Sequence, residues 1–298
     1  FAVTAVLAVA VGLVFGLVIQ PGAGVGVLQV SSDYKPKDVP GVLDVLFNIV
    51  PSNVFQALSG AASQTVDGTS VLVPRNGTVL QVIFFAGLVG FAFVKLGEKT
   101  ASLRKLVGEA SETMIQVTRF VLEFTPIGTF GLIAALVGGY GFEQLKPLAS
   151  FVVALYAACA FHIIVVYGGL LLAHGLNPLK FFRGAAPAMQ VGLVASSSFD
   201  ALPLSLRCAT DNHGVDRNYA AFAVPLGASI KMDGCGAIYP ALAAVFIAQY
   251  TGIELSWSQY VIIALASVLG SFGTAGVPGT AVIMATGVLS AANLPLEA

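Results

Sequence analysis

Charged side chains are scarce in this chain: Asp, Glu, Lys and Arg make up only 10% of its 298 residues. Ordinary soluble domains carry about 25% charged residues. Hydrophobic residues reach 57% and the mean hydropathy is +0.89, so the composition places the chain in a membrane. The net charge of −1 favours no class of partner, and we expect the lipid bilayer rather than nucleic acid around it.

Cysteine and histidine are also few. The three cysteines lie in apolar surroundings without metal-ligand spacing and are interpreted as small buried hydrophobes: Cys159, Cys208 and Cys235. The three histidines are scattered, and each is interpreted as structural or interfacial rather than as a ligand: His162, His174 and His213.

An intramembrane serine hydrolase is the enzymatic alternative for a chain with serine and histidine inside apolar segments. It requires a base held on the nucleophile. None of the histidines lies in a motif that supplies one, and the serine run 196–198 has no nucleophile-elbow pattern. We therefore expect no enzyme and no organic cofactor. Residues 1–19 lack a charged n-region and a small-residue cleavage site, so they are not interpreted as a signal peptide.

Long apolar segments dominate the chain and predict an all-α, multi-span membrane protein. Each of four segments is long enough to cross the hydrocarbon, some with help from their flanks: 1–19, 79–94, 114–137 and 148–172. Residues 29–53 and 61–78 are polar and contain Gly or Pro, so they are predicted as loops, the first leading to a short helix. The lysines and arginines on the side of the membrane that holds the 95–119 connector outnumber those on the opposite side. Because cytoplasmic loops carry an excess of Lys and Arg, this connector is predicted to lie in the cytoplasm.

Three later apolar segments, over 178–210, 219–250 and 260–289, are each interrupted near their middle. The interruptions are Ser196-Ser-Ser198 with Pro203, Lys231-Met-Asp-Gly234, and the glycine-rich run from Gly270 to Thr280. Broken helices free backbone groups that must be satisfied at membrane depth by protein, water, an ion or a ligand. Such interruptions indicate a transporter binding site.

These interruptions resemble motifs of the dicarboxylate/amino acid:cation symporter family, which includes the glutamate transporter homologues. Ser196-Ser-Ser198 followed by Leu202-Pro203 is similar to the tip of the family's first re-entrant hairpin. The segment from Pro225 to Gly234 resembles its unwound seventh helix, usually written Asn-Met-Asp-Gly-Thr. Gly273-Thr-Ala-Gly-Val-Pro-Gly279 is similar to the second hairpin tip.

The resemblance implies a domain plan for the chain. Residues 1–20 would be the third transmembrane helix and belong to a transport domain, and 21–142 would form a scaffold and trimerisation region with the fourth and fifth helices. Residues 143–298 would complete the transport domain with the sixth helix, the first hairpin (about 178–210), the seventh helix (about 219–250) and the second hairpin (about 256–291). The chain is then expected to be a fragment without the first two and the eighth helices, unable to transport alone.

The same resemblance implies a function. By this resemblance, the protein would be a secondary active symporter in the plasma (cell inner) membrane, which moves a small anionic dicarboxylate or amino acid together with Na⁺ or H⁺. The family mechanism is an elevator, in which a transport domain slides against a homotrimeric scaffold and the second hairpin is the outer gate.

Substrate-binding residues are predicted at the two hairpin tips and the unwound helix, where hydroxyls and free backbone amides suit an anion. They are Ser196, Ser197, Ser198, Met232, Cys235, Gly276, Val277, Pro278 and Gly279. An exposed helix cap is the simpler interpretation of the three serines alone. The presence of the other two breaks favours the site.

Cation-binding residues follow from the resemblance, with hard oxygen ligands for Na⁺. Gly227 and Asp233 map to one site. Ser229, Ser271, Phe272 and Thr274 map to another, the last three largely through carbonyls. Thr4 maps to a third, although its hydroxyl could instead face a carbonyl of its own helix.

Three residues depart from the family pattern. Lys231 replaces an asparagine of a cation site, so its ammonium group would repel sodium or fill the role of a bound cation; alternatively it snorkels away or pairs with Asp233. Cys235 replaces a threonine that contacts the substrate. Asp200 places a carboxylate near the anion site, where it would repel a dicarboxylate unless protonated or paired, or would serve proton coupling. An uncoupled exchanger or a sensor is therefore the alternative function.

Overall fold

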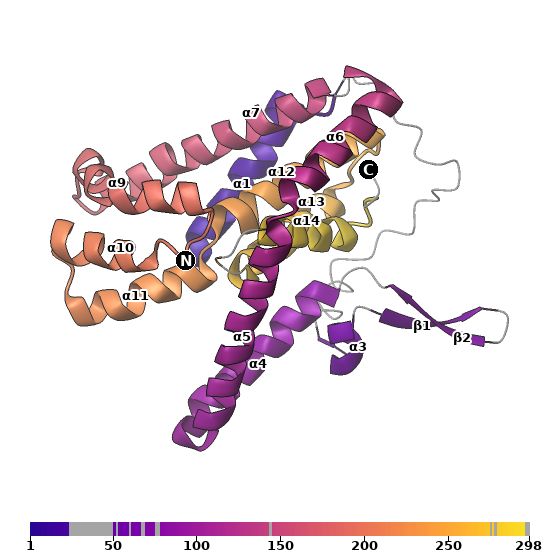
Figure 1. Cartoon of the computed structure of the whole chain (residues 1–298). Helices are drawn as coiled ribbons and strands as arrows, with labels where there is room; N and C mark the ends of the chain where they lie inside the picture. Colours follow the sequence, from indigo (N-terminus) through magenta and orange to yellow (C-terminus); the bar gives the residue numbers. More distant parts are fainter. Residues whose placement is uncertain are drawn as a thin grey trace. The chain divides into compact units, whose positions relative to one another are not determined.

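The computed structural model describes residues 1–23, 50–51, 53–59, 61–66, 69–74, 78–142, 145–274, 276 and 279–295. The chain divides into two compact units, which are described separately (Figure 1). Phe1–Val45 and Ser150–Ala298 form the first unit, and Leu46–Ala149 forms the second. Whether they correspond to a transport domain and a scaffold stays a prediction.

The described residues of the second unit form helices and a β-hairpin. Its helices are α3 (Val54–Ser59), α4 (Thr78–Leu96), the 3₁₀ turn η1 (Gly97–Thr100), α5 (Ala101–Leu122) and α6 (Thr125–Tyr140). Strands β1 (Ala61–Val66) and β2 (Thr69–Pro74) pair antiparallel. The loop predicted over 61–78 was therefore wrong for residues 61–66 and 69–74, whereas the prediction of a helical membrane protein agrees with the other described segments. A break separates α5 from α6, which begins with Pro126 in its first turn.

The described residues of the first unit form helices, several of them interrupted. It contains α1 (Ala2–Ile19), most of α7 (Leu145–Phe161) continued by the π-helix η3 (His162–Tyr167) and α8 (Gly168–Ala173), α9 (Pro178–Ala195), and α10 (Leu202–Arg207) continued by η4 (Cys208–Asn212). It ends with α11 (Arg217–Ile230), η5 (Asp233–Ile238), α12 (Tyr239–Thr251), α13 (Trp257–Gly273) and α14 (Thr280–Ala291).

Helices α9 and α10 form the first helical hairpin, which we call hairpin 1 (residues 178–212). The Asn177 side chain caps α9 by accepting hydrogen bonds from the next turn, as short polar side chains do at helix starts. The helix ends at Ser196, whose backbone is left-handed with φ 49°. At the open end, the Asn212 amide donates to the Gly184 carbonyl at 2.7 Å and so ties the two arms together.

Helices α13 and α14 form the second helical hairpin, hairpin 2 (residues 257–291). Ser256 and Gln259 make a reciprocal capping box at the start of α13. Gln259 also donates to the Ala292 carbonyl at 3.1 Å, which joins the open ends of the two arms. The helical pattern stops at Thr274 and resumes after Gly279, within the glycine-rich run in which the sequence predicted a break.

The third predicted interruption separates α11 from η5. Lys231 (φ −123°, ψ 77°) and Met232 (φ −110°, ψ 65°) both leave helical geometry. The chain then turns into the π-helix η5 before α12 continues. All three apolar segments with predicted breaks are thus broken at or within a few residues of the expected positions.

The core of this unit lies where α1 packs against η5 and α12. Ala5 and Ala8 of α1 and Ile238 and Leu242 of the facing segment are almost completely buried. A side chain at Gly12 would place Cβ 2.8 Å from the Ile238 carbonyl oxygen. Small residues on this face therefore let the two backbones approach closely, as in helix pairs of membrane proteins.

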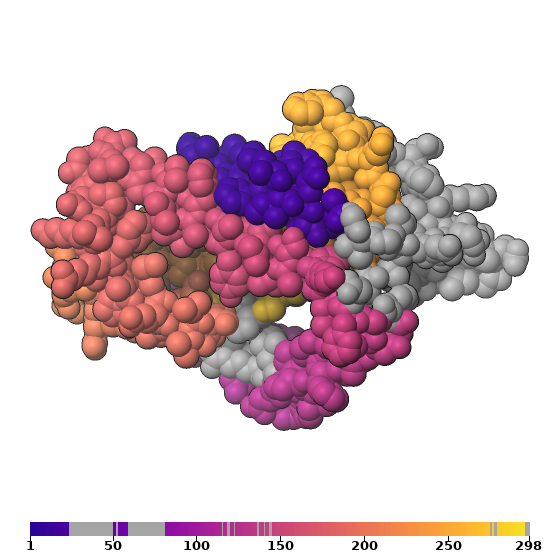
Figure 2. Space-filling model, turned by 90° about the horizontal axis from the view of Figure 1, so that it is seen from above, coloured from indigo at the N-terminus to yellow at the C-terminus, as the bar shows by residue number. Residues whose placement is uncertain are grey.

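One face of α1, drawn in indigo in Figure 2, is exposed, and the large exposed side chains of this helix are apolar. Val3, Val14 and Val18 are more than half exposed. In the part of the chain that the structure describes, four helical stretches are long and apolar enough to span a membrane by length and composition: Ala2–Ile19, Gln81–Met114, Leu145–Ala173 and Arg217–Thr251. Exposed apolar faces on such helices are what contact with lipid requires.

Candidate functional site

The tips of the two hairpins are in direct contact. The Gly276 carbonyl of hairpin 2 accepts the Ser197 hydroxyl at 3.0 Å and the Ser198 amide at 3.0 Å, and the Phe199 amide lies 3.4 Å away. Ser197 is buried. Three donors of one tip therefore converge on one acceptor of the other, and the pairing satisfies backbone groups that both breaks expose.

The unwound segment between α11 and η5 lies beside these tips. The Ser198 hydroxyl approaches the Met232 sulfur at 3.8 Å. A Cβ atom at Gly276 would lie 2.9 Å from the Ala228 carbonyl oxygen and 3.2 Å from the Met232 methyl carbon. Ser197, Ser198, Met232 and Gly276, predicted from three separate motifs, are thus brought together.

The other predicted tip residues differ in how they are placed. Ser196 is exposed and Cys235 is half-buried with a free thiol. Gly279 precedes α14 with φ 85°, a left-handed conformation that favours glycine. Val277 and Pro278 lie outside the described residues. The structure thus brings together only part of the predicted substrate-binding residues.

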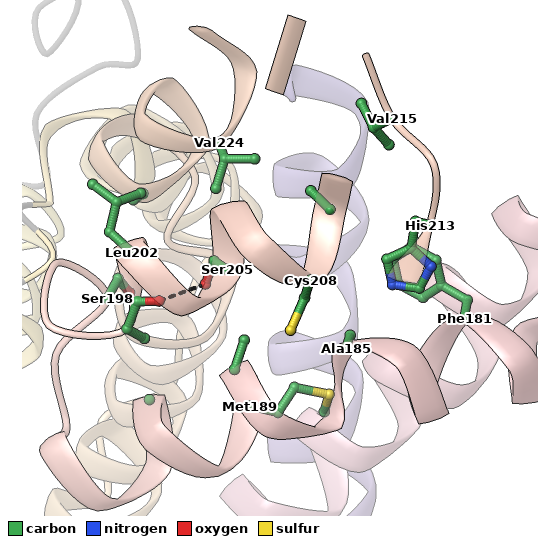
Figure 3. A pocket seen from close by; sticks show the side chains of 15 residues that line it. Phe181, Ala185, Met189, Ser198, Leu202, Ser205, Cys208, His213, Val215 and Val224 are labelled. Carbon is green, nitrogen blue, oxygen red and sulfur yellow. Dashed lines mark hydrogen bonds between the residues drawn. The ribbon is translucent and has the colours of Figure 1, made fainter. Parts of the chain in front are cut away.

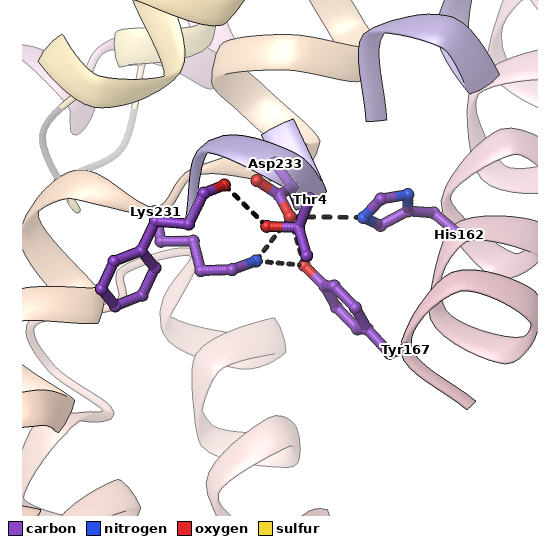
Figure 4. Close-up of polar contacts among 6 residues, drawn as sticks. Thr4, His162, Tyr167, Lys231 and Asp233 are labelled. Carbon is purple, nitrogen blue, oxygen red and sulfur yellow. Dashed lines mark hydrogen bonds and ion pairs between the residues drawn. The ribbon is translucent and has the colours of Figure 1, made fainter. Parts of the chain in front are cut away.

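Asp233 is the centre of a buried polar cluster (Figure 4). Its Oδ2 atom lies 2.5 Å from the Lys231 ammonium nitrogen, 2.7 Å from the Tyr167 hydroxyl and 3.3 Å from His162 Nε2. The Lys231 ammonium also donates to the Tyr167 oxygen at 2.9 Å. Of the alternatives for Lys231, pairing with Asp233 is the one that the structure adopts.

The hydrogen-bond partners of Asp233 all bind one of its two carboxylate oxygens. Oδ1 of the same carboxylate is buried without a hydrogen-bond partner, and so is Nδ1 of His162. A buried carboxylate in a membrane segment is costly and is normally kept for a function. The cluster compensates the charge of Asp233 with the cation of Lys231 while one carboxylate oxygen keeps its accepting capacity.

A second group of predicted cation ligands packs around Gly236 of η5. A Cβ there would lie 2.6 Å from the Ser271 Cα and 2.7 Å from the Thr274 hydroxyl oxygen. The Thr274 hydroxyl donates to the Gly270 carbonyl at 2.6 Å, whereas the buried Ser271 hydroxyl has no partner. An unpaired buried oxygen is the one feature of this group that suits an added cation.

Three of the remaining predicted cation ligands use an oxygen for a hydrogen bond within their own helix or its cap. Ser229 donates to the Pro225 carbonyl at 2.9 Å, and the Gly227 carbonyl accepts the Lys231 amide at 3.0 Å. The Thr4 hydroxyl donates to the Phe1 carbonyl at 2.8 Å, which is the alternative that the sequence left open. Phe272 is half-buried. Among the described residues, no group of three His, Cys, Asp or Glu is arranged to hold a metal ion.

An apolar cavity of about 450 Å³ lies between α9, the α10–η4 arm and α11 (Figure 3). Ser198, Ser205 and His213 are the hydrogen-bonding side chains of its lining, which among the described residues contains no Lys or Arg. It therefore offers no lysine or arginine as a counter-ion for an anionic ligand. The exposed Asp200, whose amide binds the Ser197 hydroxyl at 3.2 Å, is not among the lining residues.

Sequence reasoning missed two members of the Asp233 cluster. His162 was interpreted as structural or interfacial, and Tyr167 was not considered. Both are polar residues inside the apolar span 148–172, and this was the available signal. The interpretation of the other two histidines agrees with their contacts: His213 stacks on Phe181 with ring centroids 4.6 Å apart, and His174 binds the Leu170 carbonyl.

The interrupted apolar helices and the buried ion pair define a multi-pass helical membrane protein of the transporter class. The family model described as "Sodium:dicarboxylate symporter family" matches residues 1–298. The chain therefore belongs to this family, whose characterised relatives here are transporters rather than enzymes. It is an integral protein of the plasma (cell inner) membrane.

Curated relatives give the same assignment. The proton/sodium-glutamate symport protein of Geobacillus stearothermophilus is 30% identical over 305 residues, covering 100% of this chain and 68% of the relative. The C4-dicarboxylate transport protein of Rhodopseudomonas palustris (strain BisB18) is 32% identical over 297 residues, covering 98% of this chain and 62% of the relative. The C4-dicarboxylate transport protein 2 of Pseudomonas aeruginosa (strain UCBPP-PA14) is 30% identical, covering 99% and 66%. The chain thus spans about two thirds of the length of these relatives.

Proposed function

We propose that the full-length protein is a secondary active symporter for a small anionic substrate, either a C4-dicarboxylate or an acidic amino acid. The relatives whose names state glutamate or C4-dicarboxylate transport support both substrate classes. The coupling ion is Na⁺ or H⁺, in keeping with the family description and with the name of the first relative.

The observation that carries this proposal is the pairing of the two hairpin tips through Ser197, Ser198 and Gly276. In the proposed mechanism, hairpins 1 and 2 are re-entrant and their tips meet within the membrane. The hydroxyl and amide donors that now bind the Gly276 carbonyl are suited to an anion when hairpin 2 moves away. The proposed substrate site comprises Ser196–Ser198, Met232, Cys235 and Gly276–Gly279.

The division into two units supports an elevator, in which the first unit carries the substrate site and the second belongs to a scaffold. All the tip and cluster contacts described above lie within the first unit, so that unit can move as one body without breaking them. We propose that the scaffold assembles as a homotrimer.

Uptake by the purified full-length protein in proteoliposomes tests this function. Radiolabelled C4-dicarboxylates and acidic amino acids are supplied separately with an inward Na⁺ gradient, an inward H⁺ gradient or neither. We expect accumulation of one substrate class under at least one gradient. Binding of either substrate with no uptake under any gradient would refute symport and would support a sensor.

An uncoupled exchanger is the second candidate, and the Lys231–Asp233 ion pair favours it. A cation fixed in the protein cannot be carried down a gradient and released, so it contributes nothing to coupling. Exchange of internal for external substrate that continues without any ion gradient would identify this function.

A further inference from the structure

The Asp233 carboxylate is surrounded on one oxygen by hydrogen-bond donors. Lys231, Tyr167 and His162 all approach Oδ2, and the Asp233 side chain is only 3% exposed. A bound Na⁺ instead needs several oxygen ligands that turn lone pairs toward it, such as carbonyls of an unwound helix. The negative charge of the Asp233 carboxylate is already paired with the ammonium group of Lys231.

The broken helix explains why this pairing forms. Two residues at positions i and i+2 of a regular helix point in different directions and do not face each other. In an extended segment, residues two apart lie on the same side. Because Lys231 and Met232 leave helical geometry, the side chains of Lys231 and Asp233 converge. The non-helical backbone of the unwound segment therefore places the Lys231 ammonium group against the Asp233 carboxylate.

The ammonium group is held by more than the carboxylate. It donates to the Tyr167 oxygen at 2.9 Å and lies 4.6 Å from the centre of the Tyr167 ring. The Tyr167 hydroxyl in turn donates to Asp233. A cation placed against this carboxylate would meet the charge of Lys231 at close range, in a site where burial weakens screening.

We propose that Lys231 is a tethered counter-ion that takes the place of a coupling cation at Asp233, so that Asp233 of this chain binds no sodium ion. The inference rests on the proposed function, since a coupling cation is what the lysine replaces. It deepens that function: any sodium dependence of the protein must arise elsewhere, for instance at the unpaired Ser271 hydroxyl.

The test measures sodium binding without substrate, in the purified full-length protein. The midpoint of thermal unfolding is recorded as NaCl replaces choline chloride at constant ionic strength, from about 1 to about 100 mM, because a ligand that binds the folded state raises the midpoint. The wild type is compared with Lys231→Asn, Asp233→Asn and the double variant. Lys231→Arg is the matched control because it keeps the charge.

We expect Lys231→Asn to gain a sodium response of about 5 °C beyond that of the wild type, as a new site of millimolar affinity would give. The gain should disappear in the double variant, because the new site needs the carboxylate. Lys231→Arg should respond as the wild type does. Equal responses of the wild type and a folded Lys231→Asn would overturn the proposal.

The Asp233→Asn variant tests the proposal independently if Lys231→Asn does not fold. A wild-type protein with no sodium response, or with one that survives Asp233→Asn, supports the tethered counter-ion. Loss of a wild-type response in Asp233→Asn would show sodium at Asp233 and overturn it. Because no arm uses substrate, failure of uptake would refute the proposed symport function without affecting these comparisons.

Discussion

The Ser197 hydroxyl donates to the Gly276 carbonyl at 3.0 Å and joins two residues that are 79 positions apart. Each of the two lies at a break in an apolar helix, where the backbone groups lack partners within the helix. The contact therefore gives the Gly276 carbonyl of one hairpin tip a hydrogen-bond donor from the other tip. Separating the tips would therefore expose the same donors that we propose for the anionic substrate.

Substitution Ser197→Ala is expected to loosen the tip contact. A neutral hydrogen bond contributes about 1 kcal/mol, so the open population should rise about fivefold. Hydrogen exchange of the Ser198 and Phe199 amides, which also point at Gly276, would report this change. The control is Ser205→Ala, because the Ser205 hydroxyl binds the Ala201 carbonyl within its own arm. Unchanged exchange in Ser197→Ala would refute a stabilising role for the hydroxyl.

Substitution Gly276→Ala is expected to push the tips apart by steric conflict. Its Cβ would lie 2.9 Å from the Ala228 carbonyl oxygen and 3.1 Å from the Ser198 Cβ, which are too close without a backbone shift. We expect uptake by the full-length protein to fall about tenfold or more, as small displacements at a site can cause. Gly192→Ala is the matched control, since its nearest new contact is an ordinary 3.7 Å. Comparable uptake in the two variants would contradict the close packing at Gly276.

The three breaks could be predicted from the sequence because glycine, proline and polar residues interrupt apolar segments, and this pattern is local. The hairpin of β1 and β2 was missed, although its sequence carries a signal. Asp67-Gly68 lies between two segments that contain β-branched threonine and valine residues, and such a dipeptide is typical of two-residue hairpin turns. A polar segment with glycine was interpreted as a loop, and this signal was not weighed.

The Asp233 cluster could be predicted only in part. Lys231 and Asp233 are two positions apart in the sequence, and their pairing was one of the alternatives that the sequence left open. Tyr167 and His162 lie 66 and 71 positions from Asp233. Their side chains reach it from the π-helix η3, whose extra residue per turn changes which side chains face inward. Hydropathy does not reveal such a local change in helix geometry.

Substitution Tyr167→Phe is expected to destabilise the protein by about 1–3 kcal/mol. It removes the hydroxyl that donates to Asp233 and accepts from Lys231, and a buried polar group left short of a partner costs about this much. The midpoint and amplitude of unfolding in detergent would measure the loss. Tyr156→Phe is the control because Tyr156 is 68% exposed and its substitution should change stability by less than about 0.5 kcal/mol. Equal stability of the two variants would show that the hydroxyl is dispensable.

Two glycines of η5 provide a matched pair for testing the packing beside the second group of predicted cation ligands. At Gly236, a Cβ would lie 2.6 Å from the Ser271 Cα and 2.7 Å from the Thr274 hydroxyl oxygen. At Gly234, two residues earlier, a Cβ would meet nothing within 4 Å. Both positions have the same local helix type, so the conformational effect of adding a methyl group should be similar.

Gly236→Ala should therefore separate η5 from the end of α13 and destabilise the protein by about 1–3 kcal/mol, the usual cost of overpacking a core. Gly234→Ala should stay within about 0.5 kcal/mol of the wild type or stabilise it slightly. Unfolding of the two variants side by side measures the difference. Because the shortest Cβ contact at Gly236, with the Ser271 Cα, is with backbone rather than with a flexible side chain, a rotamer change cannot relieve it. A Gly236→Ala variant as stable as Gly234→Ala would mean that the break between α13 and α14 is free to move away from η5.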